Sequence, residues 1–286
     1  MIRNRSHLHC LHSSIMIKIT HYGPITRFDL ARTLFGRGRY WSTAYLVDGM
    51  LVDSGPAHTA RELQHALDGA RLLRIFNTHT HEDHIGGNAP LQDQDPGLEI
   101  LAHPLALEVL ADPQGKQPLH PYRRLFWGWP RPSKARSIEE GDLLETEKHC
   151  FEVIYTPGHN RDHLCLYEPR QGWLFTGDIY VGGRDRAIRA GSEIWKIIAS
   201  LKRLSQLPAS RLFPGCARVR DNPAQVLASK VIYLEELGER ILKLHQRGMD
   251  LPTITRAICG LPMPVEIITL GHFSRRNLVL SFLRDR

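Results

Sequence analysis

The chain has 286 residues, of which 42% are hydrophobic and 23% charged, and its formal net charge is +7. This composition is typical of soluble globular proteins and excludes a collagen-like, coiled-coil or intrinsically disordered chain. No apolar stretch approaches the roughly 18 to 20 residues that a membrane span requires, so we expect no membrane association. Within residues 151–220, Lys and Arg outnumber Asp and Glu by 11 to 6. This excess favours an anionic substrate but is too modest to require nucleic acid.

The N-terminal segment lacks the apolar core of a secretory signal, and the five cysteines are odd in number and widely spaced. We therefore predict a cytoplasmic protein with reduced thiols. Met16 opens the first strand-like segment, so residues 1–15 are expected to be a disordered N-terminal extension. Its histidines and Cys10 could bind a metal, but a disordered tail is favoured.

In the first half of the chain, strands and helices alternate. Asp48-Gly49 is the clearest local signal, because this dipeptide suits the tight turn of a hairpin. The expected elements are a hairpin over residues 43–53, a helix over 58–69, a strand over 71–78, a turn over 90–97 and a strand over 99–104.

The second half repeats this order. Its expected elements are a strand over residues 151–156, a hairpin over 164–178, a helix over 192–207 and a strand over 211–215. Two copies of hairpin, helix and strand predict two stacked sheets with helices outside and the functional loops along one edge. The alternative is that such elements simply recur in any α/β protein.

The last segment, residues 221–286, contains mainly helical patterns. Asn222 and Pro223 are a suitable N-cap and first-turn pair, and Gly248 ends the long helix that they begin. Shorter helical pieces divided by prolines follow. We expect this segment to be a small helical appendage packed on a main domain of residues 16–220.

The chemistry is concentrated in the string HTHEDH, residues 79–84, which follows an apolar strand. The imidazoles of His79 and His81 can coordinate one ion, because alternate residues of an extended segment point the same way. Asp83 and His84 then face a neighbouring position. Histidines crowded in this way repel one another once protonated, so the cluster predicts a metal site.

HTHEDH resembles the HxHxDH signature of the metallo-β-lactamase superfamily. Other motifs follow in that family's order: LVDSG ending at Gly55 precedes the histidines, and TPGH, FTGD and LFPGC end at His159, Asp178 and Cys216. The resemblance covers about residues 17–220. It implies an α/β fold, the αββα sandwich of two mixed β-sheets flanked by helices.

The resemblance also implies a dinuclear metal site. It assigns His79, His81 and His159 to one ion, Asp83 and His84 to a second, and Asp178 as the carboxylate that bridges both. The implied cofactor is zinc, two ions per chain, with iron or manganese as alternatives. Asp53 in LVDSG resembles a carboxylate that orients a metal-bound imidazole. Its alternative role is to close a turn.

Cys216 departs from the family, which most often has His at this last ligand position. A thiolate is a good zinc ligand, so we expect Cys216 to complete the second site. The alternative is a small buried thiol beside a weak or empty second site, with one ion per chain.

The expected mechanism follows from the metal ions. Two cations beside one water give a hydroxide at neutral pH, and Asp83 or Asp178 could serve as general base.

Residues 121–136 are rich in arginine and aromatic residues. Arg123, Arg124 and Trp127 could form a lid over an anionic, partly apolar substrate, or a subunit contact in a homodimer. Arg184, just after Asp178, is a second candidate for anion binding, with a solvated loop as its alternative.

Three functions are compatible with these features. We favour a hydrolase of a small anionic ester, thioester or lactone, similar to the glyoxalase II-like branch. The first alternative is a phosphodiesterase or endoribonuclease acting on RNA, because TPGHNRDH and the helical tail resemble a nuclease-like branch. The second is a non-catalytic metal-binding or regulatory protein in which Cys216 replaced a catalytic ligand.

Overall fold

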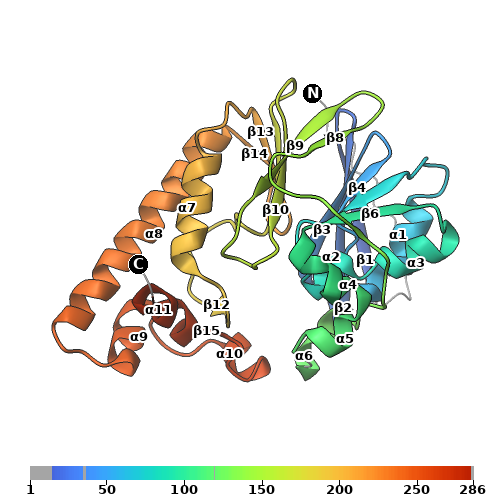
Figure 1. The fold of residues 1–286 in the computed structure, drawn as a ribbon. Helices are drawn as coiled ribbons and strands as arrows, with labels where there is room; N and C mark the ends of the chain where they lie inside the picture. Colours follow the sequence, from blue (N-terminus) through green and yellow to red (C-terminus); the bar gives the residue numbers. More distant parts are fainter. Residues whose placement is uncertain (1–14, 35–36, 119, 285–286) are drawn as a thin grey trace.

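Two β-sheets pack face to face, and helices cover both outer surfaces (Figure 1). This arrangement, seen in a computed structural model that describes residues 15–34, 37–118 and 120–284, confirms the predicted αββα sandwich. The predicted N-terminal extension lies outside the described residues, except for Ile15, which begins β1 (Ile15–Tyr22). Among the described helices, none combines the length and apolarity needed to cross a bilayer.

In the described residues, the first sheet has seven strands in the order of the sequence. They are β1, β2 (Ile25–Leu34), β3 (Arg37–Val47), β4 (Met50–Val52), β5 (Arg74–Phe76), β6 (Glu99–Ala102) and β7 (Arg136–Ser137). Neighbours are antiparallel up to β4 and parallel from there on. Asp48 and Gly49 form the predicted turn between β3 and β4, with positive φ angles of 47° and 77°.

The second sheet has six strands among the described residues, in the order β14-β13-β11-β10-β9-β8. They are β8 (Leu143–Glu145), β9 (Cys150–Tyr155), β10 (Leu164–Glu168), β11 (Trp173–Gly177), β13 (Arg211–Pro214) and β14 (Arg220–Asp221). The hairpin β10–β11 is followed by α7 (Ile194–Leu204) and by β13, parallel to β11. The first sheet has the same unit in β3–β4, α1 (Ala60–Ala66) and β5. The repeat inferred from the sequence is therefore present.

Short helices surround the first sheet. They are η1 (Ala57–Thr59), α2 (Glu82–Ile85), α3 (Asn88–Gln94), η2 (Pro104–Ala106), α4 (Leu107–Ala111), α5 (Pro113–Lys116) and α6 (Pro121–Phe126). The predicted turn over residues 90–97 is wrong in its first half, which belongs to α3. Pro90 is tolerated there because the N–H groups of a first helical turn have no intrahelical partner.

The C-terminal region packs on the outer face of the second sheet (Figure 1). Its helices are α8 (Pro223–Gln246), α9 (Leu251–Cys259), α10 (Pro264–Ile268) and α11 (Arg275–Leu283). It is not purely helical, because β15 (Phe273–Ser274) pairs with β12 (Ile188–Arg189) of the main domain. Asn222 precedes α8 in a left-handed conformation, and its side chain makes no capping hydrogen bond.

The predicted metal ligands and the orienting carboxylate Asp53 all follow the carboxyl ends of strands. Asp53 follows β4, the histidine loop follows β5, His159 follows β9, Asp178 follows β11 and Cys216 follows β13. Since β4 is parallel to β5 and β11 is parallel to β13, these ends meet along one edge of the sandwich. The apolar faces between the sheets form a shared core that fixes the two sets of loops relative to each other.

Candidate metal centre

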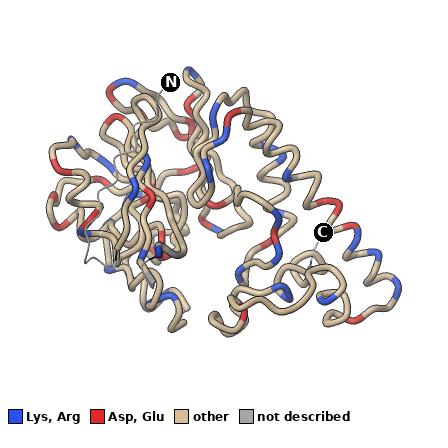
Figure 2. The backbone as a smooth tube through the Cα atoms, turned by 180° about the vertical axis from the view of Figure 1, so that it is seen from behind, with Lys and Arg blue, Asp and Glu red and all other residues tan. Residues whose placement is uncertain are grey.

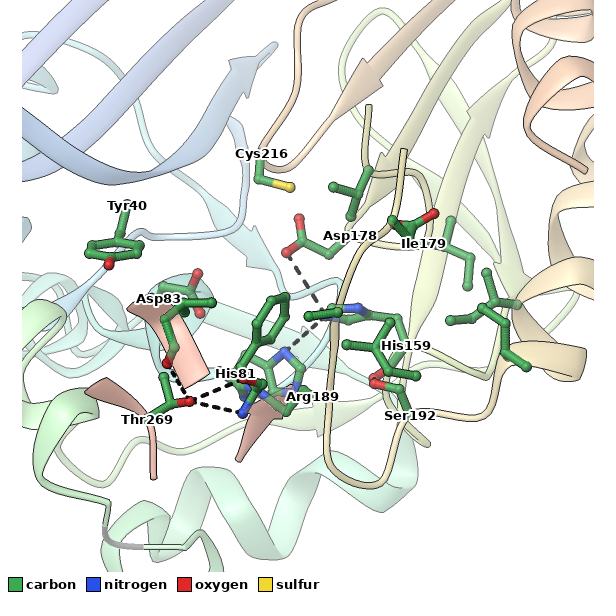
Figure 3. Close-up of a pocket in the computed structure, with 18 of the residues that line it drawn as sticks. Tyr40, His81, Asp83, His159, Asp178, Ile179, Arg189, Ser192, Cys216 and Thr269 are labelled. Carbon is green, nitrogen blue, oxygen red and sulfur yellow. Dashed lines mark hydrogen bonds and ion pairs between the residues drawn. The ribbon is translucent and has the colours of Figure 1, made fainter. Parts of the chain in front are cut away.

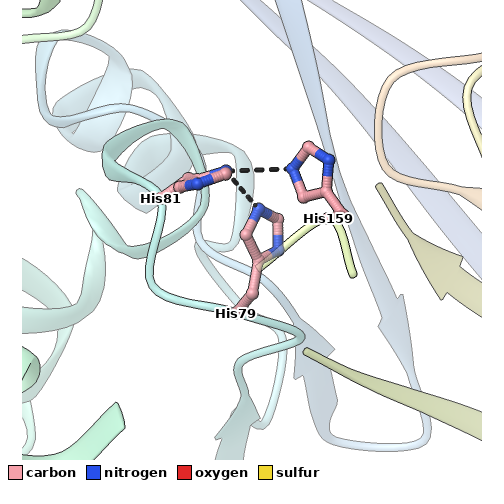
Figure 4. A group of neighbouring side chains, drawn as sticks. All are labelled: His79, His81 and His159. Atoms are coloured by element: carbon pink, nitrogen blue, oxygen red, sulfur yellow. Dashed lines mark hydrogen bonds between the residues drawn. The ribbon is translucent and has the colours of Figure 1, made fainter. Parts of the chain in front are cut away.

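Three imidazole rings converge on one point. His79 Nε2 lies 2.9 Å from His81 Nδ1, and His159 Nε2 lies 3.0 Å from the same nitrogen (Figure 4). At most one hydrogen can lie between two such nitrogens, so three converging lone pairs favour a cation at their centre. Three nitrogen ligands are a donor set that suits zinc and also iron.

These histidines are held neutral. Burial lowers the pKa of His79 and of His81 well below the usual range. The crowding of other imidazoles lowers the pKa of His79 further, and the nearby Arg189 lowers that of His81. Burial also lowers the pKa of His159, to about 4. Neutral imidazoles keep the lone pairs that metal binding requires, so the group fits a metal ion at neutral pH.

A second group of ligand atoms consists of His79, His84 and Asp178, within 4.8 Å of one another. His84 Nε2 is buried, and it has no hydrogen-bond partner among the described residues. It lies 3.5 Å from Asp178 Oδ2 and 3.7 Å from Asp83 Oδ2. Burial opposes a charge on His84, but the carboxylates of Asp53, Asp178 and Asp83 raise its pKa well above the usual value. The position therefore favours positive charge, which also suits a second cation.

Asp53 fixes the orientation of two histidines. Its carboxylate accepts hydrogen bonds from the Thr78 N–H at 2.8 Å, the Thr78 hydroxyl at 2.8 Å and His84 Nδ1 at 2.7 Å. The Thr78 oxygen also lies 3.0 Å from His79 Nδ1. Since the hydroxyl donates to Asp53, it accepts from His79, and both rings keep Nε2 free for an ion. Asp53 thus lies where the sequence placed an orienting carboxylate.

Two residues of TPGHNRDH hold the ligand loops, and sequence reasoning missed their role. His163 Nε2 accepts a hydrogen bond from the Asp178 N–H at 3.2 Å, while its Nδ1 lies 2.8 Å from Thr156 Oγ1. Asp162 accepts from the Thr80 N–H at 3.1 Å, between His79 and His81. The signal was present, because both residues closely follow the predicted ligand His159.

A cavity of about 280 Å³ adjoins the centre (Figure 3). The candidate ligands that line it are His81, Asp83, His159, Asp178 and Cys216. Cys216 lies beside Asp178 in Figure 3, and burial raises the pKa of its thiol well above the usual value. Burial also raises the pKa of Asp83, to about 6. Cys216 and Asp83 are outside the two compact groups of ligand atoms.

The predicted arginine clamp is not present in the expected form. Arg123 is buried outside the cavity, where its guanidinium binds both carboxylate oxygens of Glu82. Arg124 is exposed, and Arg184 lines a separate surface groove. Trp127 does line the cavity, together with Arg189, which no sequence motif marked. The sequence could not separate these arginines, because their roles depend on which one meets Glu82 in the fold.

A family model described as the metallo-beta-lactamase superfamily matches residues 38–216 of the chain. Curated relatives include the hydroxyacylglutathione hydrolases of Thermosynechococcus vestitus and Maricaulis maris. The first is 31% identical over 140 residues, and the second is 31% identical over 142 residues. The two matches cover 49% of this chain and 47% and 46% of the relatives. The chain therefore matches about half the length of these curated relatives.

Solved structures with the same fold include a metallo-beta-lactamase family protein, TTHA1429, from Thermus thermophilus. Its TM-score is 0.63 at 20% identity, over 90% of this chain and 91% of that one. A second is TTHA1623 in a di-iron-bound form, with a TM-score of 0.52 at 29% identity, over 66% of this chain and 94% of that one.

Proposed function

The chain belongs to the metallo-β-lactamase superfamily, and from this premise we propose that it is a metal-dependent hydrolase of a small ester or thioester. The observation that carries the proposal is the pair of ligand groups that share His79, next to a cavity that His81, His159 and Asp178 line. Zinc is the proposed metal, with two ions per chain, and iron or manganese are alternatives. The hydroxyacylglutathione hydrolases among the relatives support a thioester as the substrate.

Metal ions bound here would lower the pKa of a bound water from 15.7 to about 7 and polarise the carbonyl under attack. The protein groups supply the rest. His79, His81, His84 and His159 would hold the ions, and Asp53 keeps two of these rings in the tautomer that leaves Nε2 free. Of the carboxylates in the cavity wall, Asp83 and Asp178 lie beside the candidate ligand His84 and can take up the proton of the attacking water.

The cavity suits a small substrate better than an RNA strand. A strand needs a positively charged groove along its backbone. The cations in this cavity are Arg189 and Lys230, which lie next to the carboxylates of Glu82 and Asp185. Figure 2 shows Lys and Arg interspersed with Asp and Glu over both halves of the described chain instead of gathered in one stripe.

The test is hydrolysis of a panel of small thioesters, esters and lactones by the full chain, at two salt concentrations, beside a single-stranded RNA. We expect turnover of at least one small substrate that stops when a chelator removes the metal. Turnover should change little with salt, whereas RNA binding would weaken steeply. Salt-sensitive RNA cleavage without ester hydrolysis would favour the nuclease. Full metal content without any turnover would favour the non-catalytic protein.

A further inference from the structure

Arg189 reaches the cavity from a short strand that pairs with the C-terminal region. It lies in β12, whose only paired strand among the described residues is β15 of the C-terminal region. Its side chain is 13% exposed and lines the cavity together with His81 and Asp83. A guanidinium is thus fixed at the wall of the candidate metal centre by backbone pairing between two distant parts of the chain.

The hydrogen-bonding capacity of Arg189 is unused, unlike that of Arg123. Both oxygens of Glu82 are taken by Arg123, which also donates to Gln117 Oε1 at 2.9 Å and to the Pro118 carbonyl at 2.8 Å. Arg189 Nη2 lies 3.5 Å from Glu82 Oε1, which is too long for a good hydrogen bond. Among the described residues, its guanidinium makes no hydrogen bond, so its donors remain available to a ligand.

The charge of Arg189 is balanced, but its hydrogen-bond donors are not satisfied. Burial alone would lower the pKa of Arg189, but the carboxylates of Glu82, Asp83 and Asp178 raise it. A buried donor that lacks an acceptor costs free energy until a ligand supplies one. The indole N–H of Trp127, in the same cavity wall, is likewise buried without a hydrogen-bond partner among the described residues. Both features call for an acceptor on the bound molecule.

The rest of the cavity wall is mostly apolar. It is contributed by α6 and its end, by the loop after β11, by the paired strands β12 and β15 and by α8, with side chains that include Phe126, Trp127, Ile179, Ile188, Leu234 and Phe273. Such walls favour an apolar molecular body, because burying apolar surface contributes about 25 cal/mol per Å². A strongly hydrated peptide-like group would leave its polar atoms unsatisfied there.

We propose that Arg189 binds a carboxylate of the substrate in a bidentate pair, and that the substrate is an ester or thioester with an apolar body. This proposal rests on the proposed hydrolase function for the reaction but on the cavity for recognition. A planar guanidinium matches a carboxylate in geometry, which a lysine cannot do.

The test is calorimetric binding of two isosteric probes, 4-phenylbutanoate and its neutral primary amide, to the purified full chain. We expect wild-type protein to bind the carboxylate more tightly than the amide. Arg189→Gln should reduce this preference roughly ten- to hundredfold, the usual range for losing a hydrogen bond to a charged group. Arg170→Gln, an exposed arginine in the turn between β10 and β11, is the matched control and should keep the preference.

Binding of the carboxylate probe by the metal ions alone, without Arg189, predicts a different result for Arg189→Gln. If the carboxylate preference arose at the metal ions, Arg189→Gln would retain it, and this result would overturn the proposal. Should Arg189→Gln fail to fold, Arg189→Lys decides the question. Lysine keeps the positive charge but cannot form the bidentate pair. A several-fold loss of the preference for the carboxylate over the amide therefore supports the proposal, and an unchanged preference contradicts it. Because binding is measured without turnover, failure of the hydrolase proposal is detected separately, by the substrate panel.

Discussion

Asp53 connects two candidate metal ligands although it contacts only one of them directly. It holds His84 through one hydrogen bond and reaches His79 through the hydroxyl of Thr78. Its backbone has a φ of 60°, which is uncommon outside glycine. A strained residue with three hydrogen bonds is typical of a position selected for function and not for local stability.

Replacing Asp53 by Asn tests this orienting role. The amide group cannot accept all three hydrogen bonds, so His84 would lose the partner that keeps its proton on Nδ1. We expect metal affinity to fall roughly 10- to 100-fold, with the chain still folded. Competition with a coloured chelator measures the affinity, and Asp142→Asn, at an exposed turn, is the control. Unchanged affinity in Asp53→Asn would leave Asp53 with only the turn-closing role.

We predict that Cys216 completes the second metal site. We expect Cys216→Ala to lower occupancy of the site on Asp83 and His84 without emptying the site on His81 and His159. Cys216→His should restore the family's usual ligand and keep two metals bound. Elemental analysis of the three proteins measures these occupancies. Two tightly bound metals and full activity in Cys216→Ala would show that the thiol only fills space.

At the residue scale, the sequence identified the candidate ligands that lie close together or in known motifs. The residues at 79–84 were recognisable because ligand types crowd into six positions. Arg189 was not, since its importance follows from the pairing of Arg123 with Glu82, far apart in the sequence. The sequence also could not show that Arg123 is buried. Its predicted substrate contact is replaced by an internal ion pair with Glu82.

The loop that carries His159 is pressed against the start of α7. Gly158 has a φ of 131°, and a Cβ atom there would lie 2.4 Å from the backbone nitrogen of Ile197. The Gly158 carbonyl also accepts a hydrogen bond from the Glu193 N–H at 2.8 Å. The position of His159 therefore depends on a helix that belongs to the outer layer.

Gly158→Ala tests this dependence. Because the clash is with backbone, the loop must shift and carry His159 away from His79 and His81. We expect weaker metal binding together with a lower melting temperature. Gly141→Ala is the matched control: it also has a positive φ, 85°, but a Cβ there has open space around it. It should lower stability by about 1 to 3 kcal/mol without changing metal affinity. Equal metal affinity in both variants would contradict the account.

At the element scale, helices and strands with strong local sequence signals could be predicted, and those with weak signals could not. The Asp48-Gly49 hairpin and the amphipathic α7 were predictable from turn chemistry and spacing. α3 was missed because Pro90 suggested a break, although a first turn accepts proline. β15 was missed because two residues carry no periodicity, and their pairing with β12 depends on the whole fold.

The C-terminal region shares one hydrophobic cluster with the second sheet and α7. Phe282 of α11 is 1% exposed, and its ring packs edge-on to Trp195 of α7 with centroids 5.4 Å apart. The same region supplies Phe273 to the cavity wall. The molecule therefore depends on this region for stability and for the shape of its candidate site.

Phe282→Ala should destabilise the whole molecule. Deleting a buried Phe side chain costs about 3 to 5 kcal/mol, and the melting temperature should fall by several degrees. Ile232→Ala, at a 56% exposed position of α8, should have little effect. Thermal unfolding monitored by circular dichroism measures both. If the melting temperature of Phe282→Ala matched that of wild type, the shared core would not carry the stability assigned to it.

At the scale of the whole molecule, the fold followed from the sequence because each motif occurred in the family's order and the internal repeat supported it. Substrate, subunit arrangement and cellular location did not follow, because they depend on surfaces and cavities that periodicity does not encode. The homodimer and the cytoplasmic location stay predictions.

Metal content measured together with hydrolysis tests the central claim most directly. Wild-type chain purified without chelator should contain two metal ions and hydrolyse a small ester or thioester. His81→Ala removes the nitrogen that both His79 and His159 approach, so it should lose metal and turnover while its circular dichroism spectrum stays that of a folded chain. A His81→Ala protein with full metal content and unchanged turnover would contradict the proposal that the chain is a metal-dependent hydrolase.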